Sequence, residues 1–536
     1  MTLPKWVGSR RSAAIWLCGL ALGASLLAAQ TQNGETATYP PGKLPTFTFP
    51  ELISLSSTQP LPEVTEKKLS TVLHSVVLDN SASAPPPPLQ VKKLGASLRM
   101  AEWNIERGQN FDWVVLALKD PKTFRSRLAK NNPKLTLAEL DKVTAEARIL
   151  RQASVLVLNE VDLGMTRSGY RDVARDLAAA LKMNFVFGAE FVEVDPLKLG
   201  TEVLTDSDVG GDEQLKGELE SELKADPARY KGLHGSAILS RFPISNVRLQ
   251  RLPDCYDWFQ DEVSSVSKIE VGKRIASDKI FMEKIEREIR RGGRIAIAAD
   301  LKAPGGVVTV VNAHLENKCP PACRRKQMQA ILEGIRDDRN PVVLAGDMNT
   351  TGADASKLSL GYIAKSKLKD YRFWAGQAVR FGTPIPSLFP LNYFKNYNDP
   401  TARDIKVLAN NKEAAFFSDL EKFQFADQGQ FDFRGERQYT VNGTSKRLAN
   451  SNQRGTKGFV YTFSLPRDFK GFYGRFKLDW FFVKPGYQDG ARTRRFAPAF
   501  ARTMVSLNKA PLERISDHCP ITVDLPVNAS AKKKSK

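Results

Sequence analysis

The sequence predicts an α/β (α+β) fold, because apolar segments of strand length alternate with segments of helical periodicity from residue 98 onward. A second observation is that polar side chains capable of catalysis directly follow several of the apolar segments. The chain, at 536 residues with 42% hydrophobic content, is also long enough to enclose a large core. These observations predict a sheet-based domain that carries functional groups at the ends of its strands.

The expected strands are apolar runs that end beside polar residues or contain one. In chain order the runs and their polar neighbours are 98–103 with Asn104, 155–158 with Asn159, Glu160 and Asp162, 307–311 with Asn312, His314 and Glu316, 342–345 with Asp347 and Asn349, 478–483 with Asp479, and 521–525 with Asp517 and His518. A carboxylate inside the apolar run 478–483 is costly to bury alone, so Asp479 is expected to be paired.

Three segments between these runs have the spacing of amphipathic helices. Apolar residues recur three and four positions apart over 136–152, over 171–183 and over 324–335. Their interleaving with the strands supports the α/β assignment.

The phrase from Gly346 to Asn349 is the most informative of the strand ends. Gly346 lets the chain turn, and Asp347 and Asn349 then emerge two residues apart, on the same side of the strand end. A carboxylate and an amide held together on a rigid strand suit a hydrated hard cation and a phosphate. Taken alone, the same phrase also makes an ordinary turn.

Six short motifs in one order resemble the endonuclease/exonuclease/phosphatase superfamily, which includes deoxyribonucleases of the pancreatic type, abasic-site endonucleases, inositol polyphosphate phosphatases and bacterial sphingomyelinases. The motifs are Trp103-Asn104-Ile105, Asn159-Glu160-Val161-Asp162, the run from Gly235 to Ile244, Asn312-Ala313-His314-Leu315, Gly346-Asp347-Met348-Asn349, and Ser516-Asp517-His518-Cys519-Pro520. The resemblance covers roughly residues 97–527. It implies a four-layer sandwich of two packed β-sheets flanked by helices, with insertions at about 193–231, 254–292 and 355–475.

The resemblance also implies roles for the polar groups. Glu160 is the expected metal ligand, assisted by Asn104 and with a contribution from Asp517, and a turn cap is the alternative for Glu160. His518 is the expected general base, because an imidazole with a pKa near neutrality can take a proton from water. Asp479 is expected to orient His518.

Three further residues complete the implied catalytic set. His314 is expected to contact the phosphoryl or leaving oxygen, while Asp347 and Asn349 orient water or phosphate. Asn312 is expected to support His314 and to lie at the substrate.

Three other residues carry two interpretations each. Arg167 and Arg241 are expected either to contact phosphate or to serve as helix-cap or surface residues. His234 is expected at the rim of the substrate site or in a structural role.

The two ends of the chain predict export and a basic tail. Lys5, Arg10 and Arg11 precede an apolar stretch that ends near Ala29, which is typical of a secretory signal peptide over residues 1–29. An uncleaved membrane anchor is the alternative, because the stretch is slightly long. Residues 30–96 are rich in Pro, Ser and Thr and are expected to form a tether, and residues 528–536 a solvated basic tail. The expected location is secreted or periplasmic.

Four cysteines remain after a signal peptide is removed, and export permits disulfides. Cys319 and Cys323 are spaced to close a small loop. The alternative is that Cys255, Cys319, Cys323 and Cys519 are all free. Zinc is disfavoured, because no second pair has ligand spacing.

These observations together predict a Mg²⁺- or Mn²⁺-dependent phosphoesterase. The net charge of +20 favours an anionic partner, although basic charge also serves solubility. A nuclease-like phosphodiesterase is the leading interpretation. The alternatives are a phospholipid or sphingomyelin headgroup phosphodiesterase, a phosphomonoesterase, and a surface binding module without catalysis. No protein partner is inferred.

Overall fold

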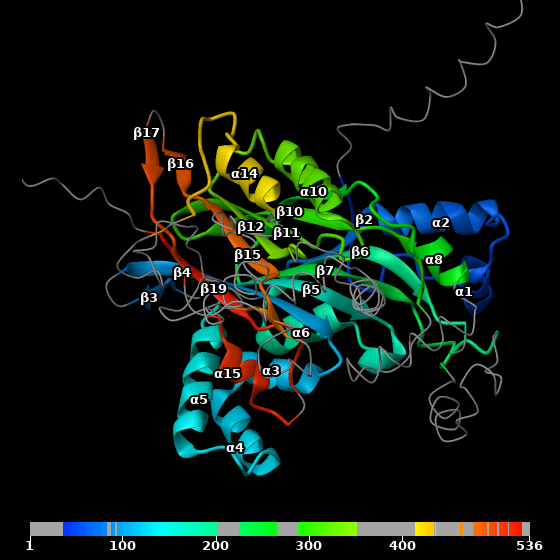
Figure 1. The fold of residues 1–536 in the computed structure, drawn as a ribbon, viewed down its shortest axis with the longest axis horizontal. Coiled ribbons are helices and arrows are strands. Elements are labelled where there is room, and N and C mark those ends of the chain that lie inside the picture. Colours follow the sequence, from blue (N-terminus) through cyan, green and yellow to red (C-terminus); the bar gives the residue numbers. More distant parts are fainter. Residues whose placement is uncertain are drawn as a thin grey trace, which may run out of the picture. The chain divides into compact units, whose positions relative to one another are not determined.

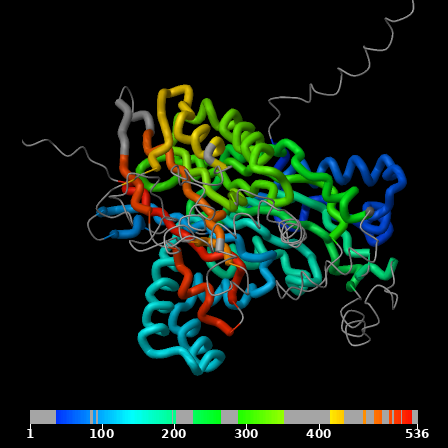
Figure 2. The backbone as a smooth tube through the Cα atoms, in the orientation of Figure 1, coloured from blue at the N-terminus to red at the C-terminus, as the bar shows by residue number. Residues whose placement is uncertain are grey.

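The computed structural model describes most of the chain from residue 36 to residue 527 (Figures 1 and 2). The described residues are 36–82, 87–91, 94–196, 198–201, 225–264, 288–350, 413–433, 435, 461–464, 475–489, 492–500, 503–512 and 514–527. They belong to the compact unit Thr36–Lys536. The expected signal peptide and basic tail lie outside them. Across the described ranges, no helix is both long and apolar enough to cross a bilayer.

The larger of two main sheets has ten strands among the described residues. Its path is β1 (Ala37–Tyr39), β2 (Ser75–Asp79), β6 (Asn184–Val194), β7 (Leu233–Ser240), β5 (Val155–Leu163), β4 (Gly95–Arg107), β19 (Ile521–Pro526) and β18 (Ala499–Phe500), with β3 (Leu89–Val91) on β4 and β9 (Ile289–Gly292) on β6. Strands β4 and β5 are parallel and place Asn104 opposite Asn159. Their polar ends therefore emerge at the same edge of the sheet.

The smaller sheet carries the second set of polar groups. Its order is β15 (Asp479–Lys484), β12 (Val342–Asp347), β11 (Gly306–Ala313), β10 (Ile295–Ala303) and β8 (Ile244–Arg251). The antiparallel register of β12 and β15 sets Asp347 directly opposite Asp479. Two short hairpins, β13 (Phe463–Ser464) with β14 (Arg475–Phe476) and β16 (Gly486–Asp489) with β17 (Arg492–Arg495), stand outside both sheets.

The two sheets pack face to face and helices cover their outer faces, as the sequence predicted. Met100, Val157, Ile297 and Phe481, all fully buried, belong to the apolar core between the sheets. Helices α3 (Phe111–Lys119), α4 (Pro121–Asn131), α5 (Leu137–Arg151) and α6 (Val173–Leu181) cover the larger sheet, whereas α10 (Pro321–Gly334) and α14 (Ala414–Lys422) cover the smaller one (Figure 1). The remaining helical segments are α1 (Phe49–Ser56), α2 (Glu63–Leu73), η1 (Thr166–Ser168), α8 (Trp258–Ser264) and α15 (Val505–Lys509).

The three predicted helices are confirmed as α5, α6 and α10. Helix α5 begins with a capping box, in which the Glu139 backbone N–H donates to Thr136 Oγ1 and the Thr136 backbone N–H donates to the Glu139 carboxylate. Its buried face includes Leu140, Val143, Ala147 and Leu150. The three- and four-residue spacing of these apolar residues is what predicted the helix. Burial of that face therefore fixes the helix on the sheet.

The expected tether over residues 30–96 is wrong for much of its described part. Strand β2 pairs antiparallel with β6, with Val76 opposite Gly188, and extends the larger sheet. Leu52 of α1, Val72 of α2 and Val76 are fully buried. These apolar positions lie within a Pro- and Ser-rich segment, but they bury against the sheet and hold the segment in place.

All three expected insertions contain buried apolar residues, among them Tyr230 in 193–231, Ile289 in 254–292 and Phe417 in 355–475. At the end of the insertion at 254–292, Ile289–Gly292 forms strand β9, which pairs with β6. Helix α14 lies inside the insertion at 355–475, and its Phe417 ring centroid lies 4.8 Å from that of Trp480. The aromatic and basic residues 371–395 and 472–473 of that insertion lie outside the described residues.

The disulfide connects a different pair from the expected small loop. Cys255 bonds Cys323, which joins the segment before α8 to the first turn of α10. Cys319 and Cys519 are buried and free. The Cys319 thiol instead contacts the Glu316 carbonyl oxygen at 3.5 Å.

Candidate active site

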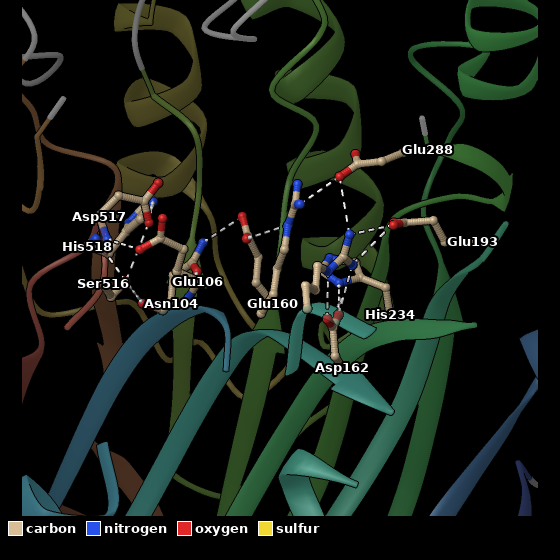
Figure 3. A network of polar contacts seen from close by, with 12 residues as sticks. Asn104, Glu106, Glu160, Asp162, Glu193, His234, Glu288, Ser516, Asp517 and His518 are labelled. Atoms are coloured by element: carbon tan, nitrogen blue, oxygen red, sulfur yellow. Dashed lines mark hydrogen bonds and ion pairs between the residues drawn. The ribbon is translucent and has the colours of Figure 1, made fainter. Parts of the chain in front are cut away.

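Five of the predicted residues come together where strands of the two sheets end. Figure 3 shows three of them, Asn104, Glu160 and His518. Asn104 and Glu160 come from neighbouring parallel strands β4 and β5, and Asp347 and Asp479 from paired positions of β12 and β15. His518 lies in the segment that leads into β19. The site is therefore built on rigid strands from both sheets.

Asn104 connects the two sheets at the centre of the site. Its Nδ2 donates to Glu160 Oε1 at 3.1 Å and to Asp347 Oδ2 at 3.2 Å. Its Oδ1 accepts from the Glu106 backbone N–H at 3.0 Å. One amide thus holds two carboxylates close to each other, and Asn104 itself is fully buried.

His518 is held by Asp479, as predicted. The His518 Nδ1 atom lies 2.8 Å and 2.9 Å from the two Asp479 carboxylate oxygens, and His518 Nε2 lies 3.6 Å from Asp347 Oδ2. Burial alone would lower the pKa of His518, but the charges of Asp479, Asp347 and Asp517 raise it well above its usual value. The backbone is also fixed, since Trp103 Nε1 donates to the His518 carbonyl oxygen at 3.0 Å.

Asp347 Oδ2 is the atom on which the site converges. Besides Asn104 and His518, His314 Nε2 lies 3.8 Å from it. The other oxygen, Oδ1, accepts from the Asn349 backbone N–H at 2.9 Å. Gly346 precedes it with φ +140°, and a Cβ there would overlap the Ala313 carbonyl oxygen. Glycine is therefore required for β12 to approach β11 this closely.

His314 has two partners that the sequence analysis did not identify. Its Nδ1 lies 3.2 Å from Glu190 Oε1 and 2.9 Å from Arg294 Nη1, and Arg294 Nη1 also lies 2.7 Å from Glu190 Oε2. Burial opposes ionisation of Glu190, but the charges of His314 and Arg294 lower its pKa. Glu190 is one of two glutamates in the mostly apolar, buried strand β6, and a carboxylate in such a strand is the signal that would have identified it.

Glu102 is a buried carboxyl beside this machinery. Neither of its oxygens has a hydrogen-bond partner, and the residue is fully buried. Burial, then the charges of Asp479 and Asp347, raise its pKa well above the usual range. The raised pKa favours the neutral form of Glu102 beside these carboxylates.

The carboxylates fit a divalent cation. Burial opposes ionisation of Glu160, but Arg107 and then His314 lower its pKa well below the usual value, so it is charged. Asp347, Asp479 and His518 also offer ligand atoms within 4.8 Å of one another. Since Asp479 and His518 already bond each other, Glu160 and Asp347, bridged by Asn104, are the carboxylates better placed to hold a hard cation.

Other predicted residues lie near the site without joining its centre. Asp517 Oδ1 lies 4.0 Å from His518 Nε2, on the His518 side rather than beside Glu160 (Figure 3). Asn349 Nδ2 donates to the Leu315 carbonyl oxygen. Asn312 is fully buried, donating to two backbone carbonyls and accepting from Asn159, so it supports the scaffold rather than binding substrate.

Arg167 and His234 belong to a neighbouring ionic network. Arg167 donates to both oxygens of Asp162 at 2.7 Å and 3.0 Å, and His234 Nδ1 lies 2.8 Å from Asp162 Oδ1. His234 is buried, which supports its structural interpretation over the rim interpretation. Arg241 follows the end of β7 that pairs with the start of β5, so it lies away from the site.

Comparisons with known proteins agree with this geometry. The matching sequence model is that of the Endonuclease/Exonuclease/phosphatase family, over residues 101–518. Similar solved structures include an endonuclease/exonuclease/phosphatase from Beutenbergia cavernae DSM 12333, at 15% identity and TM-score 0.32 over 80% of this chain and 71% of that chain. Human Nocturnin has 12% identity and TM-score 0.31, over 83% and 96%. The 3′ phosphatase NExo from Neisseria has 17% identity and TM-score 0.35, over 80% and 99%.

These structural likenesses are weak, and they add no argument to the family match. Among curated proteins, none matches the chain. The family match spans most of the sequence and contains every catalytic residue described above. The chain therefore belongs to the endonuclease/exonuclease/phosphatase family of metal-dependent phosphoester hydrolases.

Proposed function

We propose that this protein is an exported Mg²⁺- or Mn²⁺-dependent phosphodiesterase that cleaves nucleic acid. The observation that carries the proposal is the approach of His518 Nε2, held at Nδ1 by Asp479, to the Asp347 carboxylate that Asn104 bridges to Glu160. The general base His518, the carboxylate of Asp347 and the metal carboxylate of Glu160 thus lie within one site.

Each residue has a step that its geometry allows. In its neutral form, His518 takes the proton of the attacking water at Nε2, and Asp479 stabilises the imidazolium that forms. Asp347 orients that water. His314, held by Glu190 and Arg294, donates to the phosphoryl or leaving oxygen. A divalent cation, held by Glu160 and Asp347, neutralises charge on the phosphoryl oxygens when it is bound.

Nucleic acid is favoured because the substrate must be anionic and the protein is strongly basic. The net charge of +20 attracts a polyanion over long range. Export is supported by the layout of the first 29 residues and by the Cys255–Cys323 disulfide, because disulfides persist in oxidising compartments.

The test is an assay of the protein with Mg²⁺ or Mn²⁺, and with EDTA, on linear DNA, circular DNA, RNA, bis-p-nitrophenyl phosphate and phospholipid vesicles. His518→Ala is expected to abolish turnover while leaving DNA binding intact. His74→Ala is the matched control, since His74 is an exposed histidine that bonds only to the Ser70 carbonyl in its helix. Cleavage of circular DNA by wild type and His74→Ala, absent in His518→Ala, supports an endonuclease.

Turnover of phospholipid or of bis-p-nitrophenyl phosphate alone contradicts nucleic acid as the substrate. It still agrees with phosphoesterase activity. DNA binding without turnover of any substrate contradicts the proposed catalysis.

A further inference from the structure

Beside Glu160, the carboxylate of Glu288 lies among three arginines from three different elements. Glu288 Oε1 lies 2.6 Å from Arg107 Nη1, at the end of β4, and 3.2 Å from Arg167 Nη1, in η1. Glu288 Oε2 accepts from Arg290 Nη2 of β9 at 2.5 Å. Figure 3 shows Glu288 above Glu160 at the same strand ends. The arrangement is that of an anion-binding site occupied by a carboxylate of the chain itself.

The arginines are held in place by contacts that do not involve Glu288. Arg167 forms a bidentate pair with Asp162 and also contacts Glu193. Arg290 Nε donates to Glu193 Oε2 at 2.9 Å, and its guanidinium lies 4.5 Å from the centre of the Trp258 ring. Removal of the Glu288 carboxylate therefore leaves at least these two guanidinium groups oriented as they are.

Solvent reaches Glu288 but not the other two carboxylates that pair with Arg167 and Arg290. The Glu288 side chain is 17% exposed, against 2% for Glu193 and 0% for Asp162. Burial opposes ionisation of Glu193, but Arg167 and Arg290 lower its pKa to about 2, so it remains a fixed charge. An incoming anion can consequently replace Glu288, whereas Asp162 and Glu193 are enclosed.

The position of the site defines what it would bind. Arg107 Nε lies 3.8 Å from Glu160 Oε2, so this arginine adjoins both the metal carboxylate and Glu288. A phosphoester that reacts at Glu160 would place an adjacent group of the same molecule near the three arginines. Arginine forks bind phosphate oxygens in pairs, which favours a phosphate as that group.

We infer that Arg107, Arg167 and Arg290 form a subsite for a second phosphate group of the substrate, and that Glu288 occupies this subsite in the substrate-free protein. The inference rests on the proposed function only in assigning that phosphate to a substrate. The second phosphate is a backbone or terminal phosphate next to the one that is cleaved. Glu288 competes with the second phosphate for the arginines. It therefore weakens the binding of compounds that carry this phosphate more than the binding of compounds that lack it.

Glu288→Gln tests the inference, because it removes the competing charge and keeps the side chain's size. We would measure, by calorimetry in EDTA, the binding of inorganic phosphate and inorganic pyrophosphate to the full chain. Glu288→Gln is expected to tighten anion binding about tenfold. Adding Arg290→Gln is expected to reverse that gain, whereas adding Arg291→Gln should leave it, since Arg291 donates to the Leu55 and Ser57 carbonyls instead.

A second measurement assigns the site to the substrate. The quantity to measure is the KM of an oligonucleotide with a 5′-phosphate divided by the KM of the same oligonucleotide without it. This ratio should fall about tenfold in Glu288→Gln and keep its wild-type value in Arg291→Gln. Unchanged phosphate and pyrophosphate affinity in both Glu288→Gln and Glu288→Ala would overturn the subsite. Because the calorimetry needs no turnover, its result stands apart from any failure of the proposed nuclease activity.

Discussion

The Nδ1 atom of His518 lies 2.8 Å from Oδ2 of Asp479, and both side chains are buried. This contact leaves Nε2 as the atom that faces Asp347 Oδ2, 3.6 Å away. A histidine fixed in this way can gain a proton at Nε2 without rotating, and the carboxylate stabilises the charge that results.

Asp479→Asn should therefore lower kcat by about 10² to 10⁴ with a small change in KM, because the amide keeps the packing but cannot stabilise the imidazolium. Steady-state kinetics on the preferred substrate checks this. Asp338→Asn is the control. Asp338 pairs with Arg248 of β8, which belongs to the same sheet as Asp479 but lies away from the site. A kcat within threefold of wild type in Asp479→Asn would refute the role of the pair.

Removal of the Glu160 charge should weaken metal binding. Glu160→Gln keeps an oxygen toward Asn104 but loses the anion, so the Mn²⁺ concentration needed for half-maximal activity should rise about 10- to 100-fold. Calorimetric titration with Mn²⁺ measures the same change without turnover. Glu333→Gln, an exposed carboxylate paired with Arg336, should bind Mn²⁺ as wild type does. Equal Mn²⁺ affinity in Glu160→Gln and wild type would remove Glu160 from the metal site.

Much of the fold follows from local patterns. The core strands are buried on both faces, so each reads as an apolar run, and α5, α6 and α10 show one apolar face. Strands β1 and β2 could not be predicted in the same way. Their segment is rich in Pro and Ser, and β2 joins the sheet by pairing with β1 and with β6, which lies far along the chain.

The residues of the site also fall into those that local patterns predict and those that depend on packing. Asn104, Glu160, Asp347, Asp479 and His518 could be predicted because each stands at a strand end or breaks an apolar run. Glu190 and Arg294 act through His314, and only the packing of the two sheets shows that they reach it. Arg167 and His234 were expected at the substrate or in structural roles, and Asp162 draws both into a buried network.

Glu190 provides the next prediction. Glu190→Gln removes the anion that contacts His314 Nδ1, so His314 is held less firmly for donation to the leaving oxygen and kcat should fall about 10- to 100-fold. Kinetics with good and poor leaving groups checks it, since the loss should be larger for the poor one. Glu316→Gln is the control. Glu316 contacts Arg294 Nε at 3.5 Å, so Arg294 separates it from His314. Equal losses in both variants would contradict a specific role for Glu190.

Asp172, at the start of α6, links stability to pH. Burial raises the pKa of its carboxyl from 3.8 to about 6, although its Oδ1 accepts from the Arg175 backbone N–H. The folded protein therefore binds this proton more tightly than the unfolded chain, so the group stabilises the fold below about pH 4 and this contribution is lost as the pH rises through 6. Asp172→Asn should raise the free energy of unfolding at pH 8 by roughly 1 to 2 kcal/mol and have little effect at pH 4. Urea unfolding at both pH values measures this, and an equal effect at both would exclude the linkage.

The Cys255–Cys323 disulfide should stabilise the protein by closing a long loop. The two residues are 68 positions apart, for which loop closure predicts about 4 kcal/mol. That loop contains Arg294 and His314 of the site, and its Trp258 Nε1 donates to Glu316 at 2.8 Å. A reductant should therefore lower the melting temperature of wild type and also raise KM, because the segment before α8 is no longer tied to α10. The double variant Cys255→Ser/Cys323→Ser should melt at the reduced temperature in either condition. A reductant-dependent shift in the double variant would assign the effect to another thiol, since Cys319 and Cys519 are free.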